Sequence, residues 1–170
     1  MIVTIRNFID NVILPYIFRI SEAPIRFEEL MQANKVYNDG MPVDAHLLGY
    51  RLRLGRMYLV FVIFTHLFIL PVTLIFHKVL ATIDCHYLIV VAVLFTALFF
   101  ASFTLFKEYM TELMTLRRLK EAWKIHFPHF SYAKHSKEVA GFYKEALAKE
   151  IHHRDLSRYI IDKIVGVDSM

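Results

Sequence analysis

Cysteine and glycine are scarce in this chain and its net charge is low, and each shortage excludes a kind of chemistry. The one cysteine, Cys85, excludes an internal disulfide and any zinc site that needs a pair of cysteines. The five glycines stand apart from one another, so no glycine-rich phosphate-binding loop is present. The formal net charge is only +4 with neutral histidines, and the basic residues form no stripe. Nucleic acid is therefore not an expected partner.

Charged residues are also missing from two long apolar runs, residues 57–76 and 87–106. Each run has the roughly 20 residues that a helix needs to cross the ~30 Å hydrocarbon core of a bilayer. Hydrophobic residues make up 56% of the chain, above the roughly 45–50% of soluble domains, and the excess lies in these two runs. The sequence therefore predicts an all-α membrane protein with a two-span transmembrane helical hairpin.

The hairpin divides the chain into three parts. Residues 57–106 form the hairpin itself, and its connector, residues 77–86, is short enough to favour antiparallel neighbouring helices. Cys85 lies in this connector, where we expect a small apolar filler; an intermolecular disulfide or a reactive thiol is the alternative. Residues 1–56 are expected to hold an amphipathic interfacial helix and short cytoplasmic helices. Residues 107–170 are expected to form a cytoplasmic helical stalk and C-terminal helices.

The N-terminal residues 2–20 carry apolar side chains at the spacing of an amphipathic helix, with polar residues on the other face. Such a helix lies flat in the headgroup region of a membrane or packs on a partner protein. Pro15 is expected to kink or divide it. Asp10 stands where a cleavable signal peptide would carry positive charge, so the chain is expected to keep this segment.

Residues that favour turns or helix starts lie between this segment and the first span. Pro24 favours the start of a short helix, and the Asn-Asp-Gly sequence at residues 38–40 is typical of a turn. Asp44 is a plausible N-cap. From there the pattern predicts one helix that runs through Tyr50 into the first span.

After the second span the helical pattern continues without a break. It predicts a rigid stalk that reaches to about Ile125 and ends at the Phe-Pro pair of residues 127–128. Two amphipathic helices are expected after it, near residues 137–152 and 155–165, with Gly166 ending the second. Their apolar stripes belong to a unit too small to bury much by itself, which favours packing against a partner protein.

The flanking cations predict the orientation of the hairpin. Short loops rich in Lys and Arg stay on the cytoplasmic side, and the connector carries only Lys78, offset by Asp84. Both termini should therefore be cytoplasmic, in a bacterial inner membrane, or on the matrix side, in a mitochondrial inner membrane. Cations at the surface also attract anionic lipids by about 1 kcal/mol each. The candidate headgroup-binding residues are Arg51, Arg53, Arg56, Lys107, Arg117 and Arg118.

A few polar or helix-distorting residues inside the spans are candidates for function. His66 lies in the middle of the first span, and an ionisable residue there is costly; its depth matches that of Thr96, so we expect a hydrogen bond between them. A contact with another subunit, a proton relay, or haem ligation by two symmetry-related His66 residues are the alternatives. Pro71 should bend the outer third of the helix, as a packing kink or a gating hinge. Ala97 and Ala101 form a small-residue pair that lets another helix approach closely, in this chain or another subunit.

Histidines outside the spans offer no regular ligand spacing. We expect His126, His129, His152 and His153 to be solvated or capping residues rather than zinc ligands. No catalytic residue, cofactor or metal site is predicted, and the chain is not expected to be an enzyme.

These features favour a non-catalytic integral membrane subunit that scaffolds or stabilises a larger membrane protein complex. The alternative is a small homo-oligomeric channel lined by His66, Thr73, Thr96 or Ser102. A less favoured alternative is a dimeric haem-b protein that transfers electrons.

Overall fold

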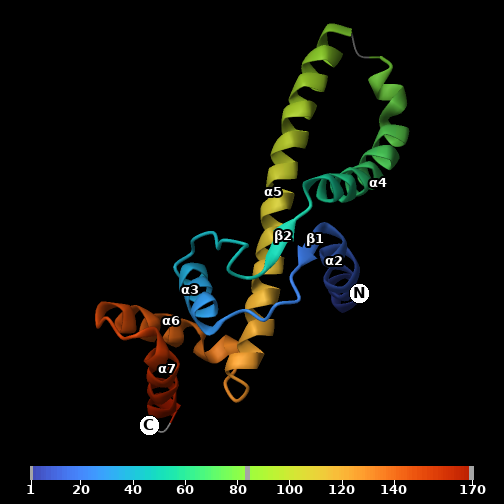
Figure 1. Cartoon of the computed structure of the whole chain (residues 1–170). Coiled ribbons are helices and arrows are strands. Elements are labelled where there is room, and N and C mark those ends of the chain that lie inside the picture. The colour runs from blue at the N-terminus through green and yellow to red at the C-terminus, as the bar shows by residue number, and fades with distance from the viewer. Residues whose placement is uncertain (1, 83–84, 169–170) are drawn as a thin grey trace. The chain divides into compact units, whose positions relative to one another are not determined.

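Helix makes up 78% of the chain in the computed structural model, which describes residues 2–82 and 85–168. The two predicted runs lie in two long helices, α4 (Leu54–Leu80) and α5 (Cys85–His126). Both are long and apolar enough to cross a membrane. They also take up most of the predicted connector, of which residues 83–84 lie outside the described residues (Figure 1). The predicted continuation of the helix is confirmed, because α5 extends past the apolar run to His126, and its role as a stalk outside a membrane stays a prediction.

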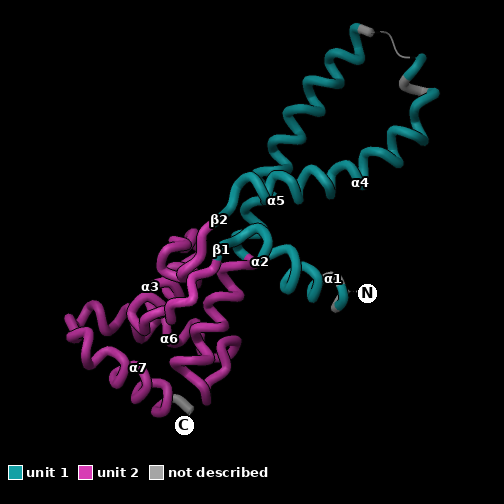
Figure 2. Tube along the Cα trace, turned by 45° about the vertical axis from the view of Figure 1, so that its right-hand side comes forward, with its two compact units in different colours: residues 1–19, 52–112 teal, residues 20–51, 113–170 magenta. Residues whose placement is uncertain are grey.

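The chain folds into two compact units (Figure 2). One contains residues 1–19 and 52–112, and we call it the apolar-helix unit. The other contains residues 20–51 and 113–170, and we call it the core unit. The predicted three-part division follows the expected sides of a membrane rather than compactness, and it stays a prediction.

The N-terminal segment is helical only as far as Ile17. It consists of α1 (Ile2–Phe8), the π-helical turn η1 (Ile9–Ile13), α2 (Leu14–Ile17) and the strand β1 (Phe18–Ile20). Pro15 lies at the start of α2, and the π turn of residues 9–13 directly precedes that helix. The predicted division near this proline is confirmed, whereas the predicted helix over residues 18–20 is wrong.

The predicted helix from Asp44 into the first span is also wrong. The Asp44 carboxylate accepts a hydrogen bond from the His46 N–H at 2.9 Å, which forms a turn instead of a helix cap. Gly49 follows with φ +61°, a left-handed conformation that favours glycine. The chain then forms the strand β2 (Tyr50–Leu52), which pairs with β1 in a two-stranded sheet.

The core unit is built from α3 (Phe27–Asn38), the end of α5, α6 (Tyr132–Ala148) and α7 (His153–Asp168). Helix α3 begins later than Pro24, because Arg26 is the N-cap of this helix. The backbone N–H of Arg26 donates to the Glu29 carboxylate at 3.0 Å. The buried Asn34 amide donates to the Ser136 carbonyl at 2.8 Å and so ties α3 to α6.

The turns of the core unit lie close to the predicted positions but not all at them. The predicted break at residues 127–128 is confirmed, and the Trp123 indole N–H donates across it to the Phe130 carbonyl at 2.8 Å. Helix α6 ends at Ala148, earlier than predicted, and Glu150 takes φ +53° in the turn that follows. Gly166 does not end α7, which continues to Asp168.

Most apolar side chains in the stripes of α6 and α7 are buried inside the core unit, whereas Leu147 is exposed. The buried members of these stripes are Val139, Ala140, Tyr143, Ala146, Leu156, Ile160 and Ile164. Hydrophobic burial inside the chain therefore accounts for these stripes, and they give no reason to expect an outside partner. That expectation now depends on the apolar-helix unit alone.

Candidate membrane-embedded surface

The apolar parts of α4 and α5 are almost uncovered by the rest of the chain. Only 6% of the most apolar window of α4, and 0% of that of α5, is buried inside the protein. Exposed apolar patches of this size are rare on soluble monomers. This surface therefore needs apolar surroundings that the chain itself does not supply.

Aromatic rings join α4 to α5 near one end of the apolar runs. The Phe61 ring lies 5.1, 5.3 and 5.5 Å, centroid to centroid, from the rings of Phe99, Phe103 and Phe106. The Tyr58 ring meets Phe103 edge-on at 5.5 Å. Such edge and tilted arrangements are favourable for aromatic pairs. They place the beginning of the first run beside the end of the second.

Threonine hydroxyls in the two runs bond to their own helix. Each donates to the carbonyl four residues earlier at 2.8–3.2 Å, in the pairs Thr65–Phe61, Thr73–Ile69, Thr96–Ala92 and Thr104–Phe100. This arrangement satisfies the hydroxyl donors without water. It suits helices in an apolar medium better than helices that line an aqueous pore.

His66 bonds within its own helix as well, so the predicted His66–Thr96 hydrogen bond is wrong. Its Nδ1 lies 2.8 Å from the Val62 carbonyl, and because a carbonyl only accepts, the geometry assigns the ring proton to Nδ1. Nε2 is then an acceptor, and no residue within 2–82 or 85–168 bonds to it. The side chain is exposed on α4, which leaves this acceptor available to an outside group.

Pro71 lies inside α4, and the helix continues through it to Leu80. Because proline lacks the N–H that would bond to the Leu67 carbonyl, a local bend is expected there. Figure 1 shows that α4 curves along its length. The predicted roles of Pro71, a packing kink or a gating hinge, stay predictions.

The small-residue pair Ala97 and Ala101 is exposed on α5. Phe99 and Phe103, which contact α4, lie two residues further along in each case. Two residues correspond to about 200° around a helix, so the small residues face away from α4. Of the two predicted partners for this face, another subunit fits the structure better than the first span.

The predicted headgroup-binding cations fall into two groups. Arg118 is only 12% exposed; its guanidinium donates to the Leu48 carbonyl at 2.9 Å and pairs with Glu121 at 3.0 Å. Arg117 pairs with the same carboxylate at 2.8 Å. Both are therefore engaged within the core unit. The other candidates, Arg51, Arg53, Arg56 and Lys107, border the apolar runs and stay predictions as lipid ligands.

The predicted roles of the histidines in the core unit are partly resolved. The His126 Nε2 lies 2.8 Å from the Ile25 carbonyl, and its ring meets Phe27 edge-on at 5.6 Å, so it closes the end of α5. The rings of His152 and His153 contact one another in a tilted arrangement, with their centroids 4.1 Å apart. Among the described residues, no three His, Cys, Asp or Glu side chains gather where they could hold a metal ion.

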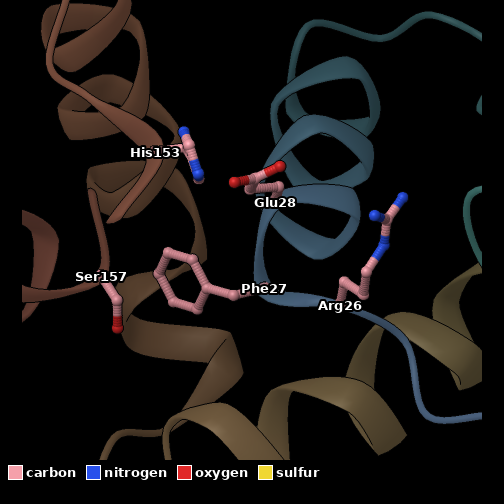
Figure 3. Close-up of a pocket in the computed structure, with 5 residues that line it drawn as sticks. All are labelled: Arg26, Phe27, Glu28, His153 and Ser157. Carbon is pink, nitrogen blue, oxygen red and sulfur yellow. The ribbon is translucent and has the colours of Figure 1, made fainter. Parts of the chain in front are cut away.

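Sequence reasoning missed an open pocket of about 520 Å³ in the core unit. Its lining residues are Arg26, Phe27, Glu28, His153 and Ser157 (Figure 3). Figure 3 shows the Glu28 carboxylate and the His153 ring on facing sides of it. The Arg26 guanidinium is already bound to Glu29 at 2.7 Å. No motif could have indicated this pocket, because its two halves come from distant parts of the sequence.

An ionic cluster on α6 and α7 was also missed. Lys149 Nζ lies 2.6 Å from the Glu145 carboxylate, and Lys163 Nζ lies 3.4 Å from it. The hydrogen bond from Lys149 and a second from Tyr159 lower the pKa of Glu145 from 4.5 to about 2. The i, i+4 spacing of Glu145 and Lys149 was a sequence signal for the first pair.

Comparison of the chain with protein-family models, curated proteins and solved structures finds no match.

Proposed function

We propose that the chain is an integral membrane protein and a non-catalytic subunit of a larger membrane protein complex. In this proposal α4 and α5 cross the bilayer as a hairpin, and the core unit stands on the cytoplasmic or matrix side with both termini. The observation that carries the proposal is the nearly complete exposure of both apolar helices, in a chain whose core unit buries most apolar side chains of α6 and α7. A bilayer supplies the apolar surroundings that this surface needs.

The hydrogen bonds of the spans support a lipid environment. Within a hydrocarbon core, a polar group without a partner costs several kcal/mol. The threonine hydroxyls avoid that cost by bonding to carbonyls of their own helices. The flanking cations support the orientation, because Arg53 and Arg56 precede the first run and Lys107 follows the second.

A small-residue face on α5 and a hydrogen-bond acceptor on α4 both support a protein partner in the membrane. The small-residue face of Ala97 and Ala101 points away from α4, and it offers another helix a close approach. On the other span, the Nε2 atom of His66 needs a hydrogen-bond donor that lipid tails cannot provide. A neighbouring transmembrane subunit supplies both an opposing helix and a donor.

Purification in a mild detergent, followed by measurement of the native mass, tests this proposal. We expect larger partner proteins in fixed stoichiometry with the chain. The double variant A97L/A101L should lose them while it remains in the membrane fraction, because two leucines block close approach. The control is A92L, a single alanine-to-leucine change on a different face of α5, which should keep the partners.

Other outcomes would overturn the proposal in distinguishable ways. A monomer without partners contradicts the role as a subunit. A closed ring of identical chains supports the homo-oligomeric channel instead. A chain that stays soluble in buffer without detergent contradicts membrane insertion itself.

A further inference from the structure

The N-terminal helical segment, residues 2–17, is fixed to the beginning of α4. The Arg53 N–H donates to the Ile17 carbonyl at 2.9 Å. The Arg56 guanidinium lies 4.9 Å from the centroid of the Tyr16 ring and donates to the Tyr16 carbonyl at 3.4 Å. On the inner side of the segment, Ile13 and Ile17 are buried. The segment is thus held directly before the first apolar run begins.

The outer side of the segment is an exposed apolar face. Phe8, Val12 and Tyr16 are 51%, 52% and 41% exposed. Their spacing of four residues places them along one side of a helix. The face is narrow and flanked by polar residues, which is typical of helices that lie in a membrane interface.

Positive charge surrounds this face. The arginines of the segment and of the chain that packs on it are Arg6, Arg19, Arg53 and Arg56, whereas the one acidic residue within residues 2–19 and 52–62 is Asp10. Asp10 lies 4.0 Å from Arg6. The excess of cations favours an anionic surface as the occupant of this face.

The position of this face, at the end of the two apolar runs, also agrees with binding to an anionic membrane surface. The contact between Phe61 and Phe106 sets the ends of the two apolar runs beside one another. Directly beyond them, Arg56 of α4 lies against the Tyr16 ring of α2, and α5 has Lys107 and the exposed Tyr109. Tyrosines and cations together at the end of apolar spans are typical of the bilayer–water boundary.

We infer that the face formed by Phe8, Val12 and Tyr16, together with Arg53 and Arg56, binds the headgroup layer of anionic phospholipids. The apolar side chains enter the acyl boundary, and the two guanidiniums contact lipid phosphates. Arg56 over Tyr16 joins the two contacts, because the cation and the ring keep each other in place. This inference rests on the proposed membrane insertion, and it assigns the segment to lipid rather than to a partner protein.

Depth measurements on the full chain in vesicles test the placement. A nitroxide is attached to a cysteine at position 12 (V12C) in a C85S background, and its accessibility to oxygen and to a water-soluble nickel chelate is compared. In vesicles that contain anionic phospholipid, we expect oxygen to be favoured and the chelate to be excluded. Controls are L67C in the first span and K144C on the exposed surface of α6.

The controls separate the two hypotheses. A water-exposed label at position 12, with a lipid-exposed label at position 67, overturns the lipid-binding face and leaves the proposed membrane protein intact. A water-exposed label at position 67 overturns the membrane protein. A label at position 12 that neither probe reaches, although position 67 is in lipid, overturns the inference in favour of a protein partner.

Binding to lipid phosphates requires the charges of Arg53 and Arg56, and removing these charges gives a second test with a matched control. The variant R53Q/R56Q should bind anionic phospholipid about fivefold more weakly for each arginine removed, measured as co-purified lipid by native mass spectrometry. R56K should keep most of the binding because the charge remains. R154Q/R158Q removes two exposed cations on α7 and should have little effect. Equal losses in the two double variants would overturn the assignment.

Discussion

Leu98 and Trp123 belong to the same helix, α5, but to different units of the chain, and their surroundings are opposite. Trp123 is 1% exposed; its ring lies 4.4 Å, centroid to centroid, from the tilted ring of Phe127, and its N–H donates to the Phe130 carbonyl. Leu98 is 65% exposed, in a run where nearly every apolar side chain is uncovered. The core unit thus resembles the interior of a water-soluble protein, whereas the apolar-helix unit needs an external apolar medium.

The largest effect is expected where the core unit is densest. Trp123→Ala should lower the free energy of unfolding by about 4 kcal/mol, because it removes a large buried ring and leaves a cavity. Urea unfolding of the detergent-solubilised protein measures the change. Leu67→Ala in the exposed apolar run should stay within about 0.5 kcal/mol of the wild type. A loss as large for Leu67→Ala as for Trp123→Ala would erase the difference between the units.

A charge in the apolar-helix unit should have the next largest effect. Leu98→Lys should disfavour membrane insertion of α5 by about 3 kcal/mol, measured as the fraction of chain that remains in the membrane after alkaline extraction. Leu147→Lys adds the same charge at an exposed apolar position on α6 and should leave that fraction unchanged. Normal insertion of Leu98→Lys would contradict the bilayer position of α5.

The next prediction concerns the Nε2 atom of His66, a polar atom in the apolar part of α4. His66→Leu should weaken the association with the proposed partner complex about threefold, since interhelical hydrogen bonds in membranes contribute on average roughly 0.6 kcal/mol. His77→Leu is the control, because His77 also bonds through Nδ1 to a carbonyl of its own helix at 2.8 Å but lies near the end of α4. The two variants are compared by quantitative co-purification, and equal retention of partners would show that His66 faces lipid.

The smallest effect concerns the ionic cluster of the core unit. The pKa of Glu145 is lowered to about 2 in the folded chain, so its ionised form stabilises the fold above pH 4.5, and this stabilisation is lost as the pH falls from 4.5 towards 2. Glu145→Gln should therefore lower the melting temperature slightly at pH 6 and make a much smaller difference at pH 2. Glu150→Gln, at an exposed position in the following turn, is the control. Because Glu145 lies at the surface, the contribution is small and should shrink with added salt.

The sequence was a good guide wherever a long pattern or a strong breaker decided the structure. Two uncharged runs predicted α4 and α5, and the Phe-Pro pair predicted the end of α5 at His126. The strands β1 and β2 could not be predicted, because three-residue strands give no measurable periodicity and their pairing depends on the turn at Gly49.

Side-chain partners were the least predictable part of the candidate site. The depth argument paired His66 with Thr96, but each bonds to a carbonyl four residues earlier in its own helix. Arg118 looked like a lipid ligand in the sequence, yet it bonds to Leu48, which lies far away along the chain. Such contacts depend on the fold of the whole unit rather than on local spacing.

Labelling of cysteines from the two sides of the membrane tests the central claim most directly. In intact cells, an impermeant maleimide should label Cys85, which is the first residue of α5, and should not label K144C in a C85S background. In inside-out vesicles the result should be reversed. Labelling of both positions from the same side would contradict a hairpin that crosses the bilayer.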